Sequence, residues 1–123
     1  MTKIMVVDDD EDFTNLYKTT LRMKGYDITA VNESPAAMDM AYLVKPDVFL
    51  IDLMMPDIDG IQLCRMIRED PVFKLTPIII VTALTDSESN EVAMGAGANG
   101  YLAKPFQIDE LISKINALAE GTE

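Results

Sequence analysis

The sequence predicts a doubly wound α/β domain, (βα)5, in which five parallel strands form one sheet with helices on both faces. Short apolar runs alternate five times with segments of helical spacing. Two of the runs are nearly continuous Val/Ile/Leu/Phe stretches, which is typical of parallel strands buried on both faces. Right-handed crossovers then place helices on both sides of the sheet. The expected strands are residues 4–7, 27–31, 48–51, 77–81 and 101–103.

The first two helices have recognisable ends. Apolar and threonine side chains recur at i, i+3, i+4, i+7 and i+8 from Phe13 to Leu21, and Gly25 ends this helix. Ser34 predicts an N-cap, followed by Pro35 at the first position of a helix that continues to about Val44.

The other three helices follow the later strands. One lies between Gly60 and Asp70. The pair Thr85 and Glu88 predicts a capping box for the fourth helix, which ends in a glycine-rich segment. An apolar stripe over residues 108–118 predicts the fifth, although the Gln107 that precedes it is a weak N-cap.

The composition is that of a globular domain: 49% of the 123 residues are apolar and 25% are charged. We expect residues 1–123 to form a single domain without an output domain, either as a stand-alone protein or as a piece of a larger one. No apolar run approaches the roughly 20 residues that span a bilayer, and the N-terminus is unlike a signal peptide. A soluble cytoplasmic protein without membrane contact is expected.

The charge and the rare residue types exclude several functions. A net charge of −11 argues against direct binding of nucleic acid, whose phosphates need a basic face. The chain has no histidine, so it has no imidazole base and no histidine metal site. Its one cysteine, Cys64, cannot form an internal disulfide and is expected to be an apolar helix residue.

Residues that could form a site follow four of the five expected strands. They are Asp8 and Asp9, Asp52, Thr82 and Ala83, and Lys104 and Pro105. Ligands of parallel α/β sheets bind at the carboxyl ends of strands, so these side chains converge if strands one, three, four and five are neighbours. Three carboxylates facing one lysine favour a hard cation, and the small number of protein ligands favours Mg²⁺. Asp52 beside a metal could then be the nucleophile of aspartyl-phosphate chemistry.

Four segments in this order resemble the receiver domains of two-component response regulators: VVDDD (6–10), IDLMMPDIDG (51–60), VTA (81–83) and GYLAKPF (100–106). The resemblance covers essentially the whole chain and implies a flavodoxin-like strand order of 2-1-3-4-5. It implies that Asp52 is the phospho-acceptor. Asp9, Asp52 and the backbone carbonyl of Met54 would bind Mg²⁺ directly, and Asp8 would act mainly through bound water.

The resemblance also assigns the phosphoryl-binding and switch residues. Thr82 would hydrogen-bond the phosphoryl group, Lys104 would pair with its oxygen, and Ala83 would leave room for its approach. The peptide bond before Pro105 would be cis. Tyr101 matches an aromatic position whose ring is thought to turn inward as the threonine moves, which would alter the surface of the fourth helix, fifth strand and fifth helix. Candidate partner-facing residues there are Ser87, Glu88, Glu91, Ile108 and Leu111.

The implied function is a phosphorylation-activated switch that catalyses only its own phosphorylation and dephosphorylation. The donor would be a histidine kinase or phosphotransfer protein, the target would be a protein, and the chain would be a monomer or a weak phosphorylation-dependent dimer. Met54 and Leu84 are apolar at the two positions that flank the hydrolytic water in this family, which predicts slow self-dephosphorylation.

Three alternatives stay open. A phosphohydrolase of the haloacid-dehalogenase type needs a second aspartate two residues after its nucleophile, where this chain has Met54. A receiver-like interaction module that is never phosphorylated would be favoured by loss of the lysine, the threonine or the acids, all of which are present. A flavodoxin-like nucleotide carrier would need a glycine-rich loop after strand one, where this chain is acidic.

Overall fold

The computed structural model describes residues 1–120; residues 121–123, the end of the expected domain, lie outside the described residues. The elements are β1 (Lys3–Val7), α1 (Glu11–Met23), β2 (Asp27–Val31), the 3₁₀ turn η1 (Ser34–Ala36), α2 (Ala37–Val44), β3 (Val48–Ile51), α3 (Gly60–Glu69), β4 (Ile78–Thr82), α4 (Ser87–Gly95), β5 (Gly100–Ala103) and α5 (Ile108–Glu120). The five strands form one parallel sheet in the order β2-β1-β3-β4-β5. The predicted fold class and strand order are therefore confirmed, with β2 at an edge.

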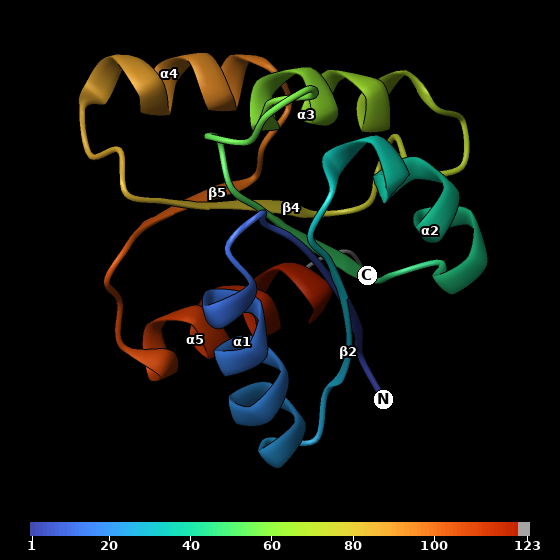
Figure 1. Ribbon diagram of the computed structural model, residues 1–123, viewed down its shortest axis with the longest axis vertical. Coiled ribbons are helices and arrows are strands. Elements are labelled where there is room, and N and C mark those ends of the chain that lie inside the picture. The colour runs from blue at the N-terminus through green and yellow to red at the C-terminus, as the bar shows by residue number, and fades with distance from the viewer. Residues whose placement is uncertain (121–123) are drawn as a thin grey trace.

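Two layers of helices bury the sheet. Helices α1 and α5 cover one face, and α2, α3 and α4 cover the other (Figure 1). Alternate residues of each strand enter opposite layers: Ile4 and Val6 pack in the layer of α1 and α5, whereas Met5 and Val7 pack in the other. Burial on both faces explains why β1, β3 and β4 read as continuous apolar runs.

The start of the second helical segment differs from the prediction. Ser34 does not cap α2; it begins the 3₁₀ turn η1, and no side-chain cap bond is made there. Its hydroxyl instead donates to the Pro56 carbonyl at 3.0 Å and accepts from the Ile58 N–H at 3.2 Å. The side chain is buried and joins this segment to the loop after β3, so the N-cap prediction was wrong.

Helix α4 begins with a different residue from the one predicted. Asp86 is its N-cap and accepts from the backbone N–H of Ser89 at 2.9 Å, so the predicted capping box of Thr85 and Glu88 was wrong. The end of α1 agrees with the prediction, because Gly25 lies just beyond the helix with a φ of +93°, a conformation that glycine adopts without strain. Within residues 1–120, no helix has both the length and the apolar character that crossing a membrane requires.

Candidate functional site

The pairing of β1 with β3 brings three carboxylates to one edge of the sheet. Val7 is paired with Ile51, so the residues that follow these two, Asp8 and Asp52, leave the sheet side by side. The Asp52 N–H donates to the Val7 carbonyl at 3.1 Å, which extends the strand pairing by one residue. Carboxylate oxygens of Asp8, Asp9 and Asp52 all lie within 4.8 Å of one another. Asp8 and Asp52 are only 2% and 9% exposed, whereas Asp9 is exposed.

Lys104 reaches this cluster from the end of β5. Its backbone N–H donates to the Thr82 carbonyl at 2.8 Å, which continues the pairing of β4 and β5 beyond Ala103. Its ammonium Nζ lies 2.7 Å from Asp8 Oδ2 and 3.2 Å from Asp52 Oδ2. The Lys104–Pro105 peptide bond is cis, the isomer that the resemblance implies.

The charges of the cluster do not balance. Burial raises the pKa of Asp8, although the hydrogen bond from Lys104 opposes the rise. Burial alone lowers the pKa of Lys104, but the hydrogen bond to Asp8 and the charges of Asp8 and Asp52 outweigh it, so the pKa of Lys104 is raised. One ammonium, which contacts Asp8 and Asp52, shares this edge of the sheet with three carboxylates.

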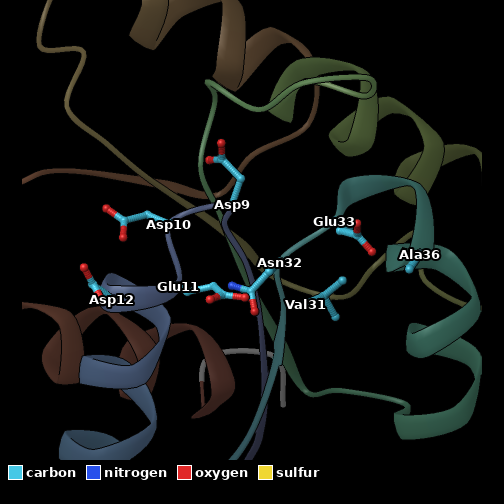
Figure 2. Close-up of a pocket in the computed structure, with 8 residues that line it drawn as sticks. All are labelled: Asp9, Asp10, Glu11, Asp12, Val31, Asn32, Glu33 and Ala36. Atoms are coloured by element: carbon cyan, nitrogen blue, oxygen red, sulfur yellow. The ribbon is translucent and has the colours of Figure 1, made fainter.

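The donor set fits a hard divalent cation. Asp8, Asp9 and Asp52 offer only oxygen atoms, and these are close enough to share one ion. Asp9 also lines an exposed acidic pocket at the ends of β1 and β2, together with Asp10, Glu11, Asp12, Val31, Asn32, Glu33 and Ala36 (Figure 2). Solvent can therefore reach the cluster from the side of Asp9, as an ion that keeps several of its water ligands requires.

The loop after β3 folds back over the end of that strand. The Met54 N–H donates to Asp52 Oδ1 at 3.3 Å, so the backbone of Met54 lies beside the cluster while its side chain is 60% exposed. The Gly60 N–H donates to the Leu53 carbonyl at 2.9 Å and brings the start of α3 against the backbone of Asp52. Sequence reasoning treated Gly60 only as a helix boundary and missed this approach.

Thr82 and Tyr101 both contact the backbone of Leu84. Thr82 is fully buried, and its hydroxyl accepts from the Leu84 N–H at 3.4 Å. The Tyr101 hydroxyl donates to the Leu84 carbonyl at 2.6 Å, and its ring is half-buried. Ala83, between Thr82 and Leu84, is exposed. The Thr82 and Tyr101 hydroxyls are therefore linked through Leu84, whose N–H contacts one and whose carbonyl contacts the other.

The residues expected to face a partner separate into two groups. Ser87, Glu88 and Glu91 are exposed on α4, and Ile108 is half-buried at the start of α5. Leu111 is fully buried, because its side chain belongs to the core between α5 and the sheet. The prediction that Leu111 faces a partner was wrong.

Known proteins share the sequence and the fold. The model of the response regulator receiver domain matches residues 4–116. The chain is 31% identical to the DNA-binding dual master transcriptional regulator RpaA of Synechocystis over 100% of this chain and 51% of that protein. It is 37% identical to the response regulator MprA of Mycobacterium leprae over 98% of this chain and 52% of that protein. The chain thus spans about half the length of these relatives.

Solved structures agree with these matches. The Francisella response regulator 1452 receiver domain has a TM-score of 0.92 and 36% identity, with 100% of both chains covered. A putative response regulator from Chloroflexus aurantiacus has a TM-score of 0.92 and 33% identity, with 97% of this chain and 98% of that chain covered. The protein belongs to the response regulator receiver domains of two-component systems, which act as phosphorylation-controlled signalling switches and not as classical enzymes.

Proposed function

We propose that this chain is a switch phosphorylated on Asp52 by the phosphohistidine of a histidine kinase or phosphotransfer protein. The observation that carries the proposal is the meeting of three carboxylates and Lys104 at the carboxyl edge of the sheet. An Asp52 carboxylate oxygen would attack phosphorus, the P–N bond of the donor would break, and the donor imidazole would take up a proton as it leaves. Asp52 directly follows β3, the middle strand of the sheet, and its N–H is still paired with the Val7 carbonyl of β1.

Asp9, Asp52 and the Met54 carbonyl would hold Mg²⁺, with Asp8 acting mainly through water. When bound, the ion would offset the carboxylate charge and stabilise negative charge on the transferring group. Lys104 would exchange a carboxylate contact for a phosphoryl oxygen, the Thr82 hydroxyl would donate to another oxygen, and the small Ala83 would leave the approach free. The oxygen-only donor set and the nearness of Lys104 support these assignments.

The signal would pass from Thr82 to the surface formed by α4, β5 and α5. The Thr82 hydroxyl accepts from the Leu84 N–H, and the Tyr101 hydroxyl donates to the Leu84 carbonyl. Turning the Thr82 hydroxyl toward a phosphoryl group would therefore release the Leu84 N–H. Tyr101 would then rearrange, and with it the surface that carries Ser87, Glu88 and Glu91.

The remaining assignments concern the setting of the switch. We place residues 1–123 in one domain that acts in the cytoplasm through protein contacts, without binding nucleic acid or membrane directly. The charge of −11 supports a protein partner with a basic surface. The chain would be a monomer or a weak dimer that forms when it is phosphorylated.

Incubation with acetyl phosphate and Mg²⁺ tests the proposal. Intact mass is expected to increase by one phosphoryl group, and the increase should disappear when a chelator removes the metal. Acetyl phosphate supplies the phosphoryl group without a partner protein, so the result depends on this chain alone. A folded protein that binds Mg²⁺ but stays unmodified would instead support an interaction module that is never phosphorylated.

The phosphorylated protein is expected to lose its phosphoryl group slowly, since neither Met54 nor Leu84 can hydrogen-bond an attacking water. Both side chains line one groove between the loop after β3 and α4. Met54→Asn should shorten the phosphoryl lifetime by about fivefold, the effect of roughly one hydrogen bond in the hydrolytic transition state. The decay of intact mass after removal of the donor measures it. Met66→Asn is the matched control, because Met66 is also exposed but lies on α3. Equal phosphoryl lifetimes for the wild type, Met54→Asn and Met66→Asn would contradict the prediction.

A further inference from the structure

The Phe13 ring covers the Lys104 ammonium on a side that the carboxylates leave free. Lys104 Nζ lies 4.1 Å from the centroid of the Phe13 ring, in the geometry of a cation–π contact. The same ammonium contacts Asp8 at 2.7 Å and Asp52 at 3.2 Å. The Lys104 side chain is only 13% exposed, so the ring and the two carboxylates account for much of its surroundings.

Neighbouring aromatic rings hold Phe13 in place. Its centroid lies 5.0 Å from that of Tyr17, one turn later on α1, and 5.9 Å from that of Phe106. Tyr17 and Phe106 stack on each other at 5.9 Å with an interplanar angle of 24°. The backbone N–H of Phe13 also donates to the N-cap Asp10 at 3.2 Å. The start of α1 therefore fixes both the acidic loop that precedes it and the ring against Lys104.

The ring is a different kind of partner from the two carboxylates. Formation of an aspartyl phosphate on Asp52 would require Lys104 to leave at least one carboxylate contact for a phosphoryl oxygen. The attraction between an ammonium and a ring face does not depend on one acceptor atom, so it can persist through that exchange. Without the ring, the flexible lysine chain would have more conformations open to it, and the strong pairing with Asp8 would have no competitor.

We propose that Phe13 is a positioning residue for Lys104: its ring face holds the ammonium between Asp8 and Asp52 and steadies it as it moves to the phosphoryl group. The inference rests on the proposed function, because it concerns the rate of phosphorylation of Asp52. It assigns Phe13 an electrostatic role in addition to packing. A ring that only fills space would act through its shape, whereas a cation–π partner acts through the electron density of its face.

Graded fluorination of Phe13 separates these two roles. Phenylalanine with one, two or three ring fluorines is incorporated at position 13, which nearly preserves the shape of the ring while withdrawing electron density from its face. The rate constant for phosphorylation by acetyl phosphate is measured at saturating Mg²⁺. Its logarithm is expected to fall steadily with the number of fluorines, to about one fifth of the wild-type rate with three. Phe106 carries the same series as the matched control, since it packs against Phe13 and is expected to give a flat response.

A second measurement needs neither metal nor phosphoryl donor. In the metal-free protein, the Lys104 methylene protons next to Nζ should resonate upfield because of the Phe13 ring current. They should return to ordinary lysine shifts in Phe13→Leu and stay upfield in Phe13→Tyr. Ordinary shifts in the wild type would overturn the contact itself.

The outcomes of the rate measurement remain distinguishable from failure of the proposed function. A wild type that is never phosphorylated refutes that function, and with it the role of Phe13 in the reaction. A wild type that is phosphorylated at rates indifferent to fluorination of Phe13 refutes the inference alone, and Phe13 is then a packing residue.

Discussion

Replacing Asp52 by asparagine is expected to abolish phosphorylation and, at the same time, to stabilise the metal-free protein. Asparagine has nearly the same shape but lacks the anionic oxygen that would attack phosphorus. Intact mass after incubation with acetyl phosphate and Mg²⁺ should therefore remain that of the unmodified chain. The variant loses activity but gains stability, because the same carboxylate would be required for phosphorylation and would lower the stability of the metal-free protein.

The stabilisation follows from the charges around Asp52. Two carboxylates lie within 4.8 Å of it, whereas its only ammonium partner among the described residues is 3.2 Å away. Two repulsions at that range outweigh one attraction, and removal of one carboxylate should raise the free energy of unfolding by about 1 kcal/mol. Urea unfolding in the presence of a chelator measures this. In Mg²⁺ the difference should shrink or reverse, because the wild type offers the ion one more anionic ligand.

Asp57→Asn is the matched control for both effects. Asp57 lies in the same loop after β3, is exposed, and has a φ of +67° that asparagine tolerates well. The variant loses the same charge but keeps the cluster, so it should be phosphorylated like the wild type and should gain little stability. Phosphorylation of Asp52→Asn at the wild-type level would refute Asp52 as the acceptor. If metal-free Asp52→Asn were less stable than the wild type, the repulsion between Asp52 and the other two carboxylates would not outweigh its attraction to Lys104.

The sheet and the edge that carries the site were predictable because each depends on a pattern that repeats. Parallel strands buried on both faces are nearly continuous apolar runs, as β3 and the first four residues of β4 are. Carboxyl ends of neighbouring parallel strands meet at one edge, so Asp8, Asp52 and Lys104 could be placed together from their positions after strands.

Two helix starts were not predictable from the sequence, because several residues in a row can cap a helix. Thr85 and Asp86 are both good N-caps, and the path of the backbone after β4 decides for Asp86. Ser34 has the residue type of a cap, but its hydroxyl is used by the loop after β3, which is distant in sequence. The same limit applies to Phe13, whose apolar spacing indicates a core residue, although its ring also faces Lys104.

Leu111 was assigned to the partner-facing surface against the periodic pattern of its own helix. Its place in the apolar stripe of α5 marks it as a core residue, and the surface formed by α4, β5 and α5 contains the same helix. The stripe already indicates which side of α5 faces the sheet, and Leu111 lies on that side. In the structure Leu111 and Ile115 are both fully buried against it.

Replacing Gly60 by alanine is expected to disturb the fold and the site together. A Cβ at this position would lie 2.3 Å from the Asp52 carbonyl oxygen and 2.7 Å from the Leu53 Cα. Both are backbone atoms, one of Asp52 and one of the residue that follows it, so neither can move aside as a flexible side chain would. Either the start of α3 moves away from β3, or the backbone of Asp52 shifts.

Each of these two movements would have a measurable effect. Moving α3 would break the hydrogen bond from the Gly60 N–H to Leu53 and loosen the packing beneath it, so the free energy of unfolding should fall by about 2–3 kcal/mol. Shifting Asp52 would misplace the proposed nucleophile relative to Lys104, and the initial rate of phosphorylation should fall roughly tenfold or more. Urea unfolding and intact mass give the two values at a temperature where the variant is folded.

Gly95→Ala is the control, because a Cβ on Gly95, the last residue of α4, meets nothing within 4 Å. This variant should keep the wild-type phosphorylation rate and be unchanged or stabilised by up to about 1 kcal/mol, since alanine favours a helix more than glycine does. If Gly60→Ala were as stable and as rapidly phosphorylated as Gly95→Ala, the close approach of α3 to Asp52 would not be what holds the acceptor in place. Loss of stability with an unchanged phosphorylation rate would show that α3 yields and that β3 alone positions Asp52.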